Sequence, residues 1–319
     1  MRIVKPSAEV MGDCCNHLQI IEDIARTCYK SSNKDNSQKK TEEFVKGLIT
    51  RQHTAMLEHY VFPIRVRKTL YDMILDKVGI EGLKYIHVTE NVETGSVIMT
   101  GSIRAWRELF SNYHSDYSFL LVYLNHIYPI VFEDLVKEIY EEVPTFEEAL
   151  TLDPADILSW EYLKGVLPYE LYCYHRCYTV KFVCDRGVSH ELVRHRPCSF
   201  AQESTRYCNY ARDDFGKEIS VISPFDSSSP EYKYWEDSCL LAEEDYFRLL
   251  EQGVTPQMAR SVLPNSLKTE IIVTTNLKEW FHIFNLRVKG TTGAPHPQMK
   301  EVMSMAYTQI CSLEGIPSV

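Results

Sequence analysis

Three segments of the chain are predicted to be β-strands: the first two alternate apolar and polar residues, the pattern of a half-buried strand, and the third contains the β-branched run Ile271, Ile272 and Val273. The segments are Tyr60–Arg67, Tyr178–Cys184 and Leu267–Thr275. Pro63 cannot donate a backbone hydrogen bond, so it predicts an edge position or a bulge for the first strand. Ser199–Tyr207 is predicted to be extended as well. These segments predict a protein with at least one β-sheet.

Helical spacing of apolar residues marks a second group of segments. The clearest helix has Ser229 as its cap, Pro230 in its first turn and Gly253 as its stop, while Ser189 is predicted to cap a shorter one. The predicted helices are Thr41–His53, Ser189–His195, Ser229–Gly253, Thr255–Leu263, Asn276–Lys289 and Gln298–Leu313.

The order of these elements predicts an α+β fold, with a mixed sheet and flanking helices in one domain over residues 1–319. Strands and helices follow one another without regular βαβ alternation. Residues 68–170 are predicted to be mainly helical, and the polar stretch Ser31–Lys40 to be a loop. The chain contains no repeat of fixed period and no low-complexity tract.

The charge balance limits the classes of partner. The chain has 34 Lys+Arg against 44 Asp+Glu, a formal charge of −10, which disfavours general nucleic-acid binding. No apolar run approaches the roughly 18 residues of a membrane span. The N-terminus lacks a signal-peptide pattern, so we expect a cytoplasmic protein with its ten cysteines reduced.

The chemistry-bearing residues concentrate in the 14 positions from Arg194 to Tyr207, which hold three arginines, a histidine and three hydroxyl residues. Guanidinium groups bind phosphate or carboxylate through paired, charge-assisted hydrogen bonds. If the segment is extended, Gln202, Ser204 and Arg206 share one face. This arrangement indicates a site for an anionic nucleotide or a nucleotide-like cofactor. The alternative is that the arginines are solvated or pair with acids such as Asp213 and Asp214.

A metal site is not expected. The spacing of Cys173, His175, Cys177 and Cys184 does not match a pair of Cys-x2-Cys knuckles, and these residues are interpreted as small buried side chains. Cys208 follows the arginine segment directly, but no base can be assigned to it, so it is interpreted as an ordinary thiol.

Four segments together resemble the flavin-dependent thymidylate synthases. Residues 194–196 (Arg-His-Arg), separated from Ser204 by seven residues, match the family's motif. Residues 275–287 resemble its TVN…NLR element, and residues 259–264 resemble its AR-x-x-LP element. A weaker match is His53…Glu58-His59, which covers residues 53–59 and is similar to the early histidine element.

The resemblance covers about residues 40–67 and 172–313 and leaves residues 68–170 as an insertion. It implies a homotetramer with active sites at subunit contacts, in which FAD is bound by several chains. The reaction it implies is methylation of dUMP to dTMP, with methylenetetrahydrofolate as carbon donor and NADPH as reductant through FAD. No cysteine nucleophile is implied.

The resemblance also assigns site residues by position. Arg287 is implied as the catalytic residue that polarises the uracil ring, a role suited to a group that stays protonated. The positions implied for FAD are His53, Arg194, His195, Arg196, Gln202, Asn276, Lys278 and His282. The positions implied for dUMP are Glu191, Arg194, Gln202, Glu203, Ser204, Arg206, Arg260 and Arg287.

Several positions depart from the family's pattern. Gln202 stands where many relatives carry glutamate, Glu191 where some carry Gln, His282 where some carry Asn, and Ala55 replaces a hydroxyl residue. Two alternatives to the enzyme therefore remain open. The chain could be a nucleotide-binding or regulatory protein that has lost catalysis, or an RNA-binding protein that uses residues 194–206 as a basic patch.

Overall fold

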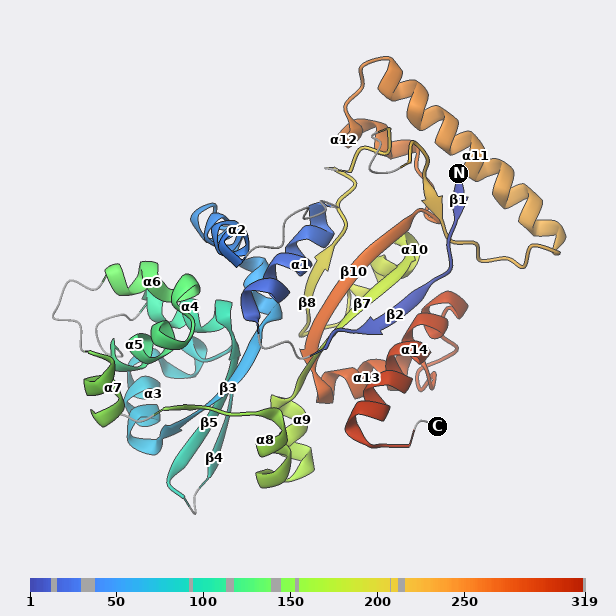
Figure 1. Ribbon diagram of the computed structural model, residues 1–319. Coiled ribbons are helices and arrows are strands. Elements are labelled where there is room, and N and C mark those ends of the chain that lie inside the picture. The colour runs from blue at the N-terminus through green and yellow to red at the C-terminus, as the bar shows by residue number, and fades with distance from the viewer. Residues whose placement is uncertain are drawn as a thin grey trace.

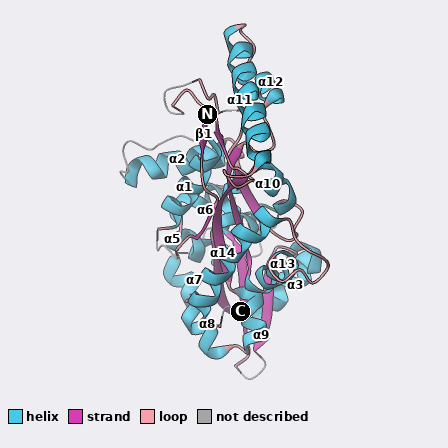
Figure 2. Ribbon diagram, turned by 90° about the vertical axis from the view of Figure 1, so that its right-hand side faces the viewer, coloured by secondary structure: helices cyan, strands magenta, loops and turns pink. Residues whose placement is uncertain are grey.

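The computed structural model describes residues 1–12, 16–29, 38–91, 94–112, 118–138, 145–152, 155–206, 208–211 and 216–317. Within them, two four-stranded sheets lie side by side, one built mostly from each half of the chain (Figure 1). Figure 2 shows helices on both sides of the strands. The predicted loop Ser31–Lys40 lies mainly outside the described residues, as do Asp213 and Asp214.

The sheet of the C-terminal half has the strand order β2-β7-β10-β8 and is antiparallel throughout. Its two long central strands pair along their whole length, from Asn276 opposite Cys177 to Lys268 opposite Asp185. The strands are β2 (Ser7–Val10), β7 (Cys177–Asp185), β10 (Lys268–Asn276) and β8 (Ser199–Gln202). Strand β2 therefore comes from the start of the chain and completes the sheet of the other half.

The sheet of the N-terminal half has the order β4-β5-β3-β6 and is antiparallel as well. Its strands are β4 (Ile86–Asn91), β5 (Ser96–Ser102), β3 (Val61–Arg67) and β6 (Asp156–Ile157). A separate parallel pair joins β1 (Arg2–Ile3) to β9 (Ser220–Val221).

Helices surround both sheets. In the N-terminal part they are α1 (His17–Tyr29), α2 (Gln38–Thr50), the 3-10 helix η1 (Thr54–His59), α3 (Lys68–Gly82), α4 (Ile103–Asn112), α5 (Ser118–Ile127), α6 (Pro129–Lys137), α7 (Phe146–Leu152), α8 (Trp160–Val166) and α9 (Tyr169–His175). In the C-terminal part they are α10 (Arg186–Leu192), α11 (Pro230–Glu251), α12 (Pro256–Ala259), the 3-10 helix η3 (Arg260–Val262), α13 (Leu277–Arg287) and α14 (Pro297–Glu314).

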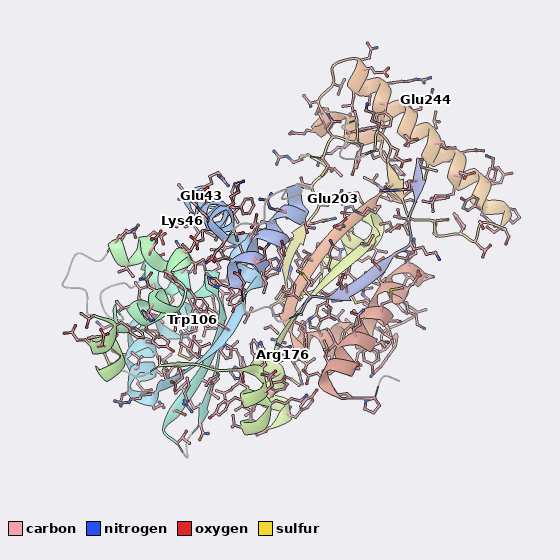
Figure 3. The ribbon with its side chains drawn as sticks, in the orientation of Figure 1. Glu43, Lys46, Trp106, Arg176, Glu203 and Glu244 are labelled. Atoms are coloured by element: carbon pink, nitrogen blue, oxygen red, sulfur yellow. The ribbon has the colours of Figure 1, made fainter. Side chains whose placement is uncertain are left out.

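Each sheet has its own apolar core. Trp106 of α4 lies in the core of the N-terminal half, and Trp280 of α13 lies in the core that α13 and α14 form against β7 and β10. Figure 3 shows Trp106 in the half opposite to Glu203, and Figure 1 shows α11 projecting away from both sheets. On the other face of the C-terminal sheet, Ile24 of α1 packs against Ile272.

The α+β prediction is confirmed, and the predicted strands correspond to β3, β7 and β10. Residues 68–170 are mainly helical but also contribute β4, β5 and β6. No helix among the described residues combines the length and apolar character needed to cross a membrane.

Three local predictions were wrong. The side chain of Asp185, not that of Ser189, caps α10 by accepting the amide of Val188 at 2.7 Å. Strand β3 is an inner strand, and Pro63 is tolerated because its neighbour β6 spans only two residues. Strand β8 ends at Gln202, so Gln202, Ser204 and Arg206 do not form one face of a strand.

Candidate active site

The site is built where two helices follow the central strands of the C-terminal sheet. Helix α10 begins directly after β7, and α13 begins directly after β10. Asn276 caps α13, since its side-chain oxygen accepts the amide of Glu279 at 2.8 Å. The last turns of the two helices carry Glu191 and Arg287, which are 96 positions apart in sequence yet in contact.

Arg287 connects the two family-like segments. Its Nε donates to Nε2 of His195 at 3.1 Å, and its Nη1 donates to Glu191 Oε2 at 3.1 Å. Burial, and then the charges of Arg287 and His282, lower the pKa of His195 to about 4. His195 is therefore neutral at pH 7 and accepts the guanidinium hydrogen bond, which leaves its proton on Nδ1.

Arg196 and Asn276 line a cavity of about 730 Å³ that opens between the two sheets. Within the wall formed by the C-terminal sheet, the Thr275 hydroxyl donates to the carbonyl of Pro197 at 2.6 Å and so joins β10 to the segment before β8. The full lining is Glu58, Val61, Lys84, Tyr85, Ile86, His87, Thr100, Gly101, Ser102, Arg104, Ala105, Glu108, Tyr174, Cys177, Arg196, Pro197, Cys198, Ser199, Thr274, Thr275 and Asn276. Its volume lies in the range of about 300–1,000 Å³ that is typical of ligand pockets.

An aromatic stack lies at this cavity. The rings of His87 and Tyr174 are nearly parallel, with centroids 5.1 Å apart. Lys278 Nζ lies 5.6 Å from the centroid of the Tyr174 ring, a cation–π contact. The predicted cofactor residue Lys278 thus contacts Tyr174, which lines the cavity.

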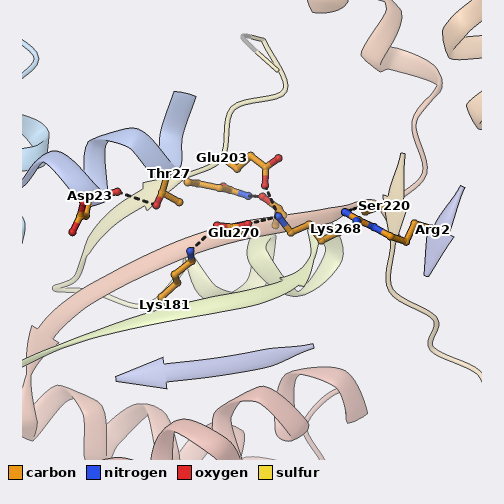
Figure 4. A network of polar contacts seen from close by, with 10 residues as sticks. Arg2, Asp23, Thr27, Lys181, Glu203, Ser220, Lys268 and Glu270 are labelled. Atoms are coloured by element: carbon orange, nitrogen blue, oxygen red, sulfur yellow. Dashed lines mark hydrogen bonds and ion pairs between the residues drawn. The ribbon is translucent and has the colours of Figure 1, made fainter. Parts of the chain in front are cut away.

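The opposite end of β10 carries a buried ion-pair network, shown in Figure 4. Lys268 Nζ lies 3.0 Å from Glu203 Oε2 and 2.5 Å from Glu270 Oε1. Lys181 pairs with the second oxygen of Glu270 at 2.8 Å. Because Glu203 is buried and paired, its carboxylate is already compensated. A smaller cavity of about 310 Å³ borders Glu203, Lys268 and Glu270.

Gln202 points to the other face of the sheet. Its side-chain amide donates to the hydroxyl groups of Ser189 at 2.9 Å and Thr269 at 3.2 Å. Its two amide hydrogens are thus used within the protein, and its carbonyl oxygen remains as the group that could contact a ligand.

Of the remaining predicted nucleotide-binding residues, Ser204, Arg206 and Arg260 come after β8 in the chain, and Arg194 comes before it. The Ser204 amide donates to the carbonyl of Cys28 at 3.0 Å. Arg260 Nη1 donates to the Thr205 hydroxyl at 3.1 Å, which brings the AR-x-x-LP segment to the arginine segment. Arg206 and Arg194 are exposed.

His53 is exposed at the start of η1 and is not among the residues that line the 730 Å³ cavity. Other residues in that lining were missed by the sequence analysis, above all Glu58, Arg104 and His87. Glu58 belongs to the family-like histidine element, and this was its only signal. Arg104 and His87 lie in residues 68–170, where no motif marks them.

The cysteine thiols near the site are either buried or protonated. Cys173 and Cys184 are buried, as predicted, and Cys208 is buried. Burial raises the pKa of Cys198 to about 12, so this thiol is protonated at neutral pH.

The family-model match lies in the C-terminal part of the chain. Residues 172–312 match the family model described as thymidylate synthase complementing protein. The flavin-dependent thymidylate synthase of Geobacter sulfurreducens is 40% identical over 103 residues, which is 32% of this chain and 43% of that protein. That of Sulfurisphaera tokodaii is 37% identical over 115 residues, which is 36% of this chain and 43% of that protein.

The matched part of the chain spans less than half the length of these curated relatives. A solved structure of the UMP/dUMP methylase PolB from Streptomyces cacaoi, bound with 5-Br dUMP, aligns with 98% of this chain and 93% of that chain. Its sequence identity is 13% and its TM-score 0.40, values too low to add to the assignment. Residues 172–312 are therefore similar to this family, and the resemblance found in the sequence is confirmed over this part of the chain.

Proposed function

We propose that the protein is a flavin-dependent thymidylate synthase that methylates dUMP to dTMP. The carbon donor is methylenetetrahydrofolate, and NADPH is the reductant through FAD. The observation that carries this proposal is the contact of Arg287 with His195 and Glu191, which joins two separate family-like segments in one site. Organisation as a homotetramer stays a prediction.

The residues around the 730 Å³ cavity fit a flavin. The cavity combines the positive charges of Arg196 and Lys84 with aromatic rings, and a dinucleotide offers a diphosphate and flat ring systems. Arg196 and Asn276 would hold the cofactor, with Lys278 at the rim. When bound, FAD supplies the hydride transfer of the reaction, while the protein supplies orientation and charge.

Arg287 would orient and polarise the uracil ring. Two of its nitrogens are held by His195 and Glu191, and Nη2 has no hydrogen-bond partner among the described residues. The guanidinium is thus fixed before substrate arrives, with donors left for a developing negative charge. Because His195 is neutral, it orients Arg287 without adding a competing positive charge.

The phosphate of dUMP would be bound by the exposed arginines after β8. Arg206 and Arg260 come from different segments that the Arg260–Thr205 hydrogen bond brings together. Ser204 and Arg194 would complete this group. Glu203 would act indirectly by fixing Lys268, and Gln202 would use its carbonyl oxygen.

The test is anaerobic reduction of the FAD-loaded protein by NADPH, followed by dUMP and methylenetetrahydrofolate. We expect the flavin absorbance to bleach and then return with stoichiometric dTMP. Bound FAD without dTMP would instead favour a nucleotide-binding protein that has lost catalysis. Failure to bind FAD, combined with salt-sensitive RNA binding, would favour the RNA-binding alternative.

Replacing Cys198 or Cys208 with serine is expected to change turnover less than about threefold, because a protonated or buried thiol is a poor nucleophile. Steady-state dTMP formation measures the effect, and circular dichroism verifies folding. Complete loss of activity in a folded variant would contradict the absence of a cysteine nucleophile.

A further inference from the structure

The two sheets have the same topology. Read from the matching edge, the orders are β4-β5-β3-β6 and β8-β10-β7-β2, and every neighbouring pair is antiparallel in both. In both sheets the second strand of the order runs directly into a helix, α4 after β5 and α13 after β10. We call residues 54–112 the first unit and residues 169–287 the second unit.

The register of the central strands is also the same. Val61 of β3 pairs with Ser102, the last residue of β5. Cys177 of β7 pairs with Asn276, the last residue of β10. The side chains of Ser102 and Asn276 both accept the amide three residues later and so cap the helix that follows.

The outer strands keep this register. Thr100 pairs with His87 of β4, and its counterpart Thr274 pairs with Ser199 of β8. At the other edge, β6 and β2 pair with equivalent residues of β3 and β7. Strand β2 precedes the first unit but joins the second sheet, whereas β6 precedes the second unit but joins the first. The two edge strands are thus exchanged reciprocally, as in domain swapping.

The sequences of the strand–helix segments agree with this equivalence. Residues 96–110 read SVIMTGSIRAWRELF, and residues 270–284 read EIIVTTNLKEWFHIF. Without gaps, they share isoleucine, threonine, tryptophan and phenylalanine at the same positions. Trp106 and Trp280 are both fully buried and stack on the phenylalanine four residues later.

The contact between the units is reciprocal. His59 precedes β3, and its Nδ1 lies 2.7 Å from the Thr274 hydroxyl of the second unit. His175 precedes β7 at the equivalent position, and its Nδ1 lies 2.7 Å from the Thr100 hydroxyl of the first unit. In a twofold-symmetric interface every contact occurs twice, with the two partners exchanged. The two histidine–threonine contacts have this property.

We propose that the chain is an internal pair of homologous units, and that the cavity between them binds the flavin with residues of both. The ligand assignment rests on the proposed function. Equivalent residues line the two sides of this cavity, Val61 with Cys177 and Ser102 with Asn276. The first unit thus supplies one wall of this cavity within the same chain.

The two units are not chemically equivalent. Counted back from the equivalent residues His87 and Ser199 at the start of the next strands, Gly82, Leu83 and Lys84 occupy the places of Arg194, His195 and Arg196. The first unit therefore lacks the motif of the site and cannot form a second copy of it. Its contribution is the opposite wall, so one cavity and one flavin are expected per chain.

Arg104 is the central polar residue of that wall. It takes the place of Lys278 in the sequence alignment of the units. Its Nη1 lies 2.5 Å from Glu58 and its Nε 2.7 Å from Glu108, and all three line the cavity. Removing the guanidinium would leave two carboxylates facing the ligand, which repel a diphosphate.

The experiment measures FAD binding by the full chain freed of flavin, using quenching of flavin fluorescence. Wild-type protein is expected to bind one FAD per chain. Arg104→Ala is expected to weaken affinity about tenfold, in line with loss of a charged hydrogen bond. Lys84→Ala changes an exposed lysine of the same wall, is expected to fold normally, and should weaken affinity about threefold.

The matched control is Arg65→Ala. Arg65 also lies in the first unit, pairs with Asp156 at 2.6 Å and is similarly exposed, 39% against 35% for Arg104, but it is outside the cavity. Its FAD affinity should equal that of wild type. If wild type binds FAD and both cavity variants bind it equally well, the role of the first unit is refuted while the proposed function stands. If wild type binds no FAD, both proposals fail.

Discussion

Replacing Arg287 with alanine is expected to lower turnover about 10²–10³-fold, the usual loss when one preorganised donor to a developing charge is removed. FAD should stay bound, because Arg287 is not among the residues that line the 730 Å³ cavity. His195 would lose its donor, and Glu191 would lose its ion pair. The measurements are single-turnover dTMP formation and the bound-flavin absorbance of the same sample.

The variant Arg287→Lys distinguishes the effect of the positive charge on turnover from the effect of the guanidinium geometry. Lysine keeps the positive charge but cannot bridge His195 and Glu191 with a planar fork, so only part of the turnover should return. Arg248→Ala, which removes an exposed arginine of α11, is the control and should behave as wild type. Loss of flavin as the main effect of Arg287→Ala would refute its assignment to the uracil end of the site.

The sequence was sufficient to predict strands with one buried face. In β7 the burial alternates residue by residue, as the apolar pattern does. Strand β5 was not found in this way, because five consecutive residues from Val97 to Gly101 are buried. Strand β10 has an equally long buried run, and it was recognised only through its β-branched residues Ile271, Ile272 and Val273. A short strand covered on both faces reads as a continuous apolar run, which cannot be distinguished from a helix segment.

The internal pair of units was not visible in the sequence, because equivalent residues are not separated by a constant number of positions. Val61 corresponds to Cys177, whereas Ser102 corresponds to Asn276, so the spacing changes within the unit and no fixed period exists. Under the proposal of two units, residues 68–170 are no simple insertion, since they hold β4, β5 and α4 of the first unit. Symmetry became visible only through register and contacts between residues far apart in the chain.

Part of the candidate site could be predicted from motifs because its residues lie in short segments. The motifs named Arg287 and His195 but not the hydrogen bond between them. They also could not show that Glu203 is paired with Lys268 from another strand. Arg104 was missed because its role depends on the packing of one unit against the other.

Acidification from pH 6.5 to 4.5 is expected to destabilise the fold strongly. Burial lowers the pKa of His59 to about 4, of His175 to about 3 and of His17 to about 4, and His195 is lowered to about 4 as well. Across this range the unfolded chain binds protons that the folded chain does not, so stability falls as pH falls. Each histidine contributes at most about 1.4 kcal/mol per pH unit, and over this range the four together are comparable with the stability of a domain.

Urea unfolding at a series of pH values measures this dependence, and His17→Phe tests its origin. The His17 ring lies between Tyr60 and Tyr128, with centroids 5.7 and 4.8 Å away, and a phenyl ring can preserve these contacts. Because the phenyl ring takes up no proton, stability should fall less steeply below pH 6.5. His190→Gln, at an exposed position, should leave the slope unchanged. An equal slope in wild type and His17→Phe would mean that His17 takes up its proton in the folded state, against the burial that lowers its pKa.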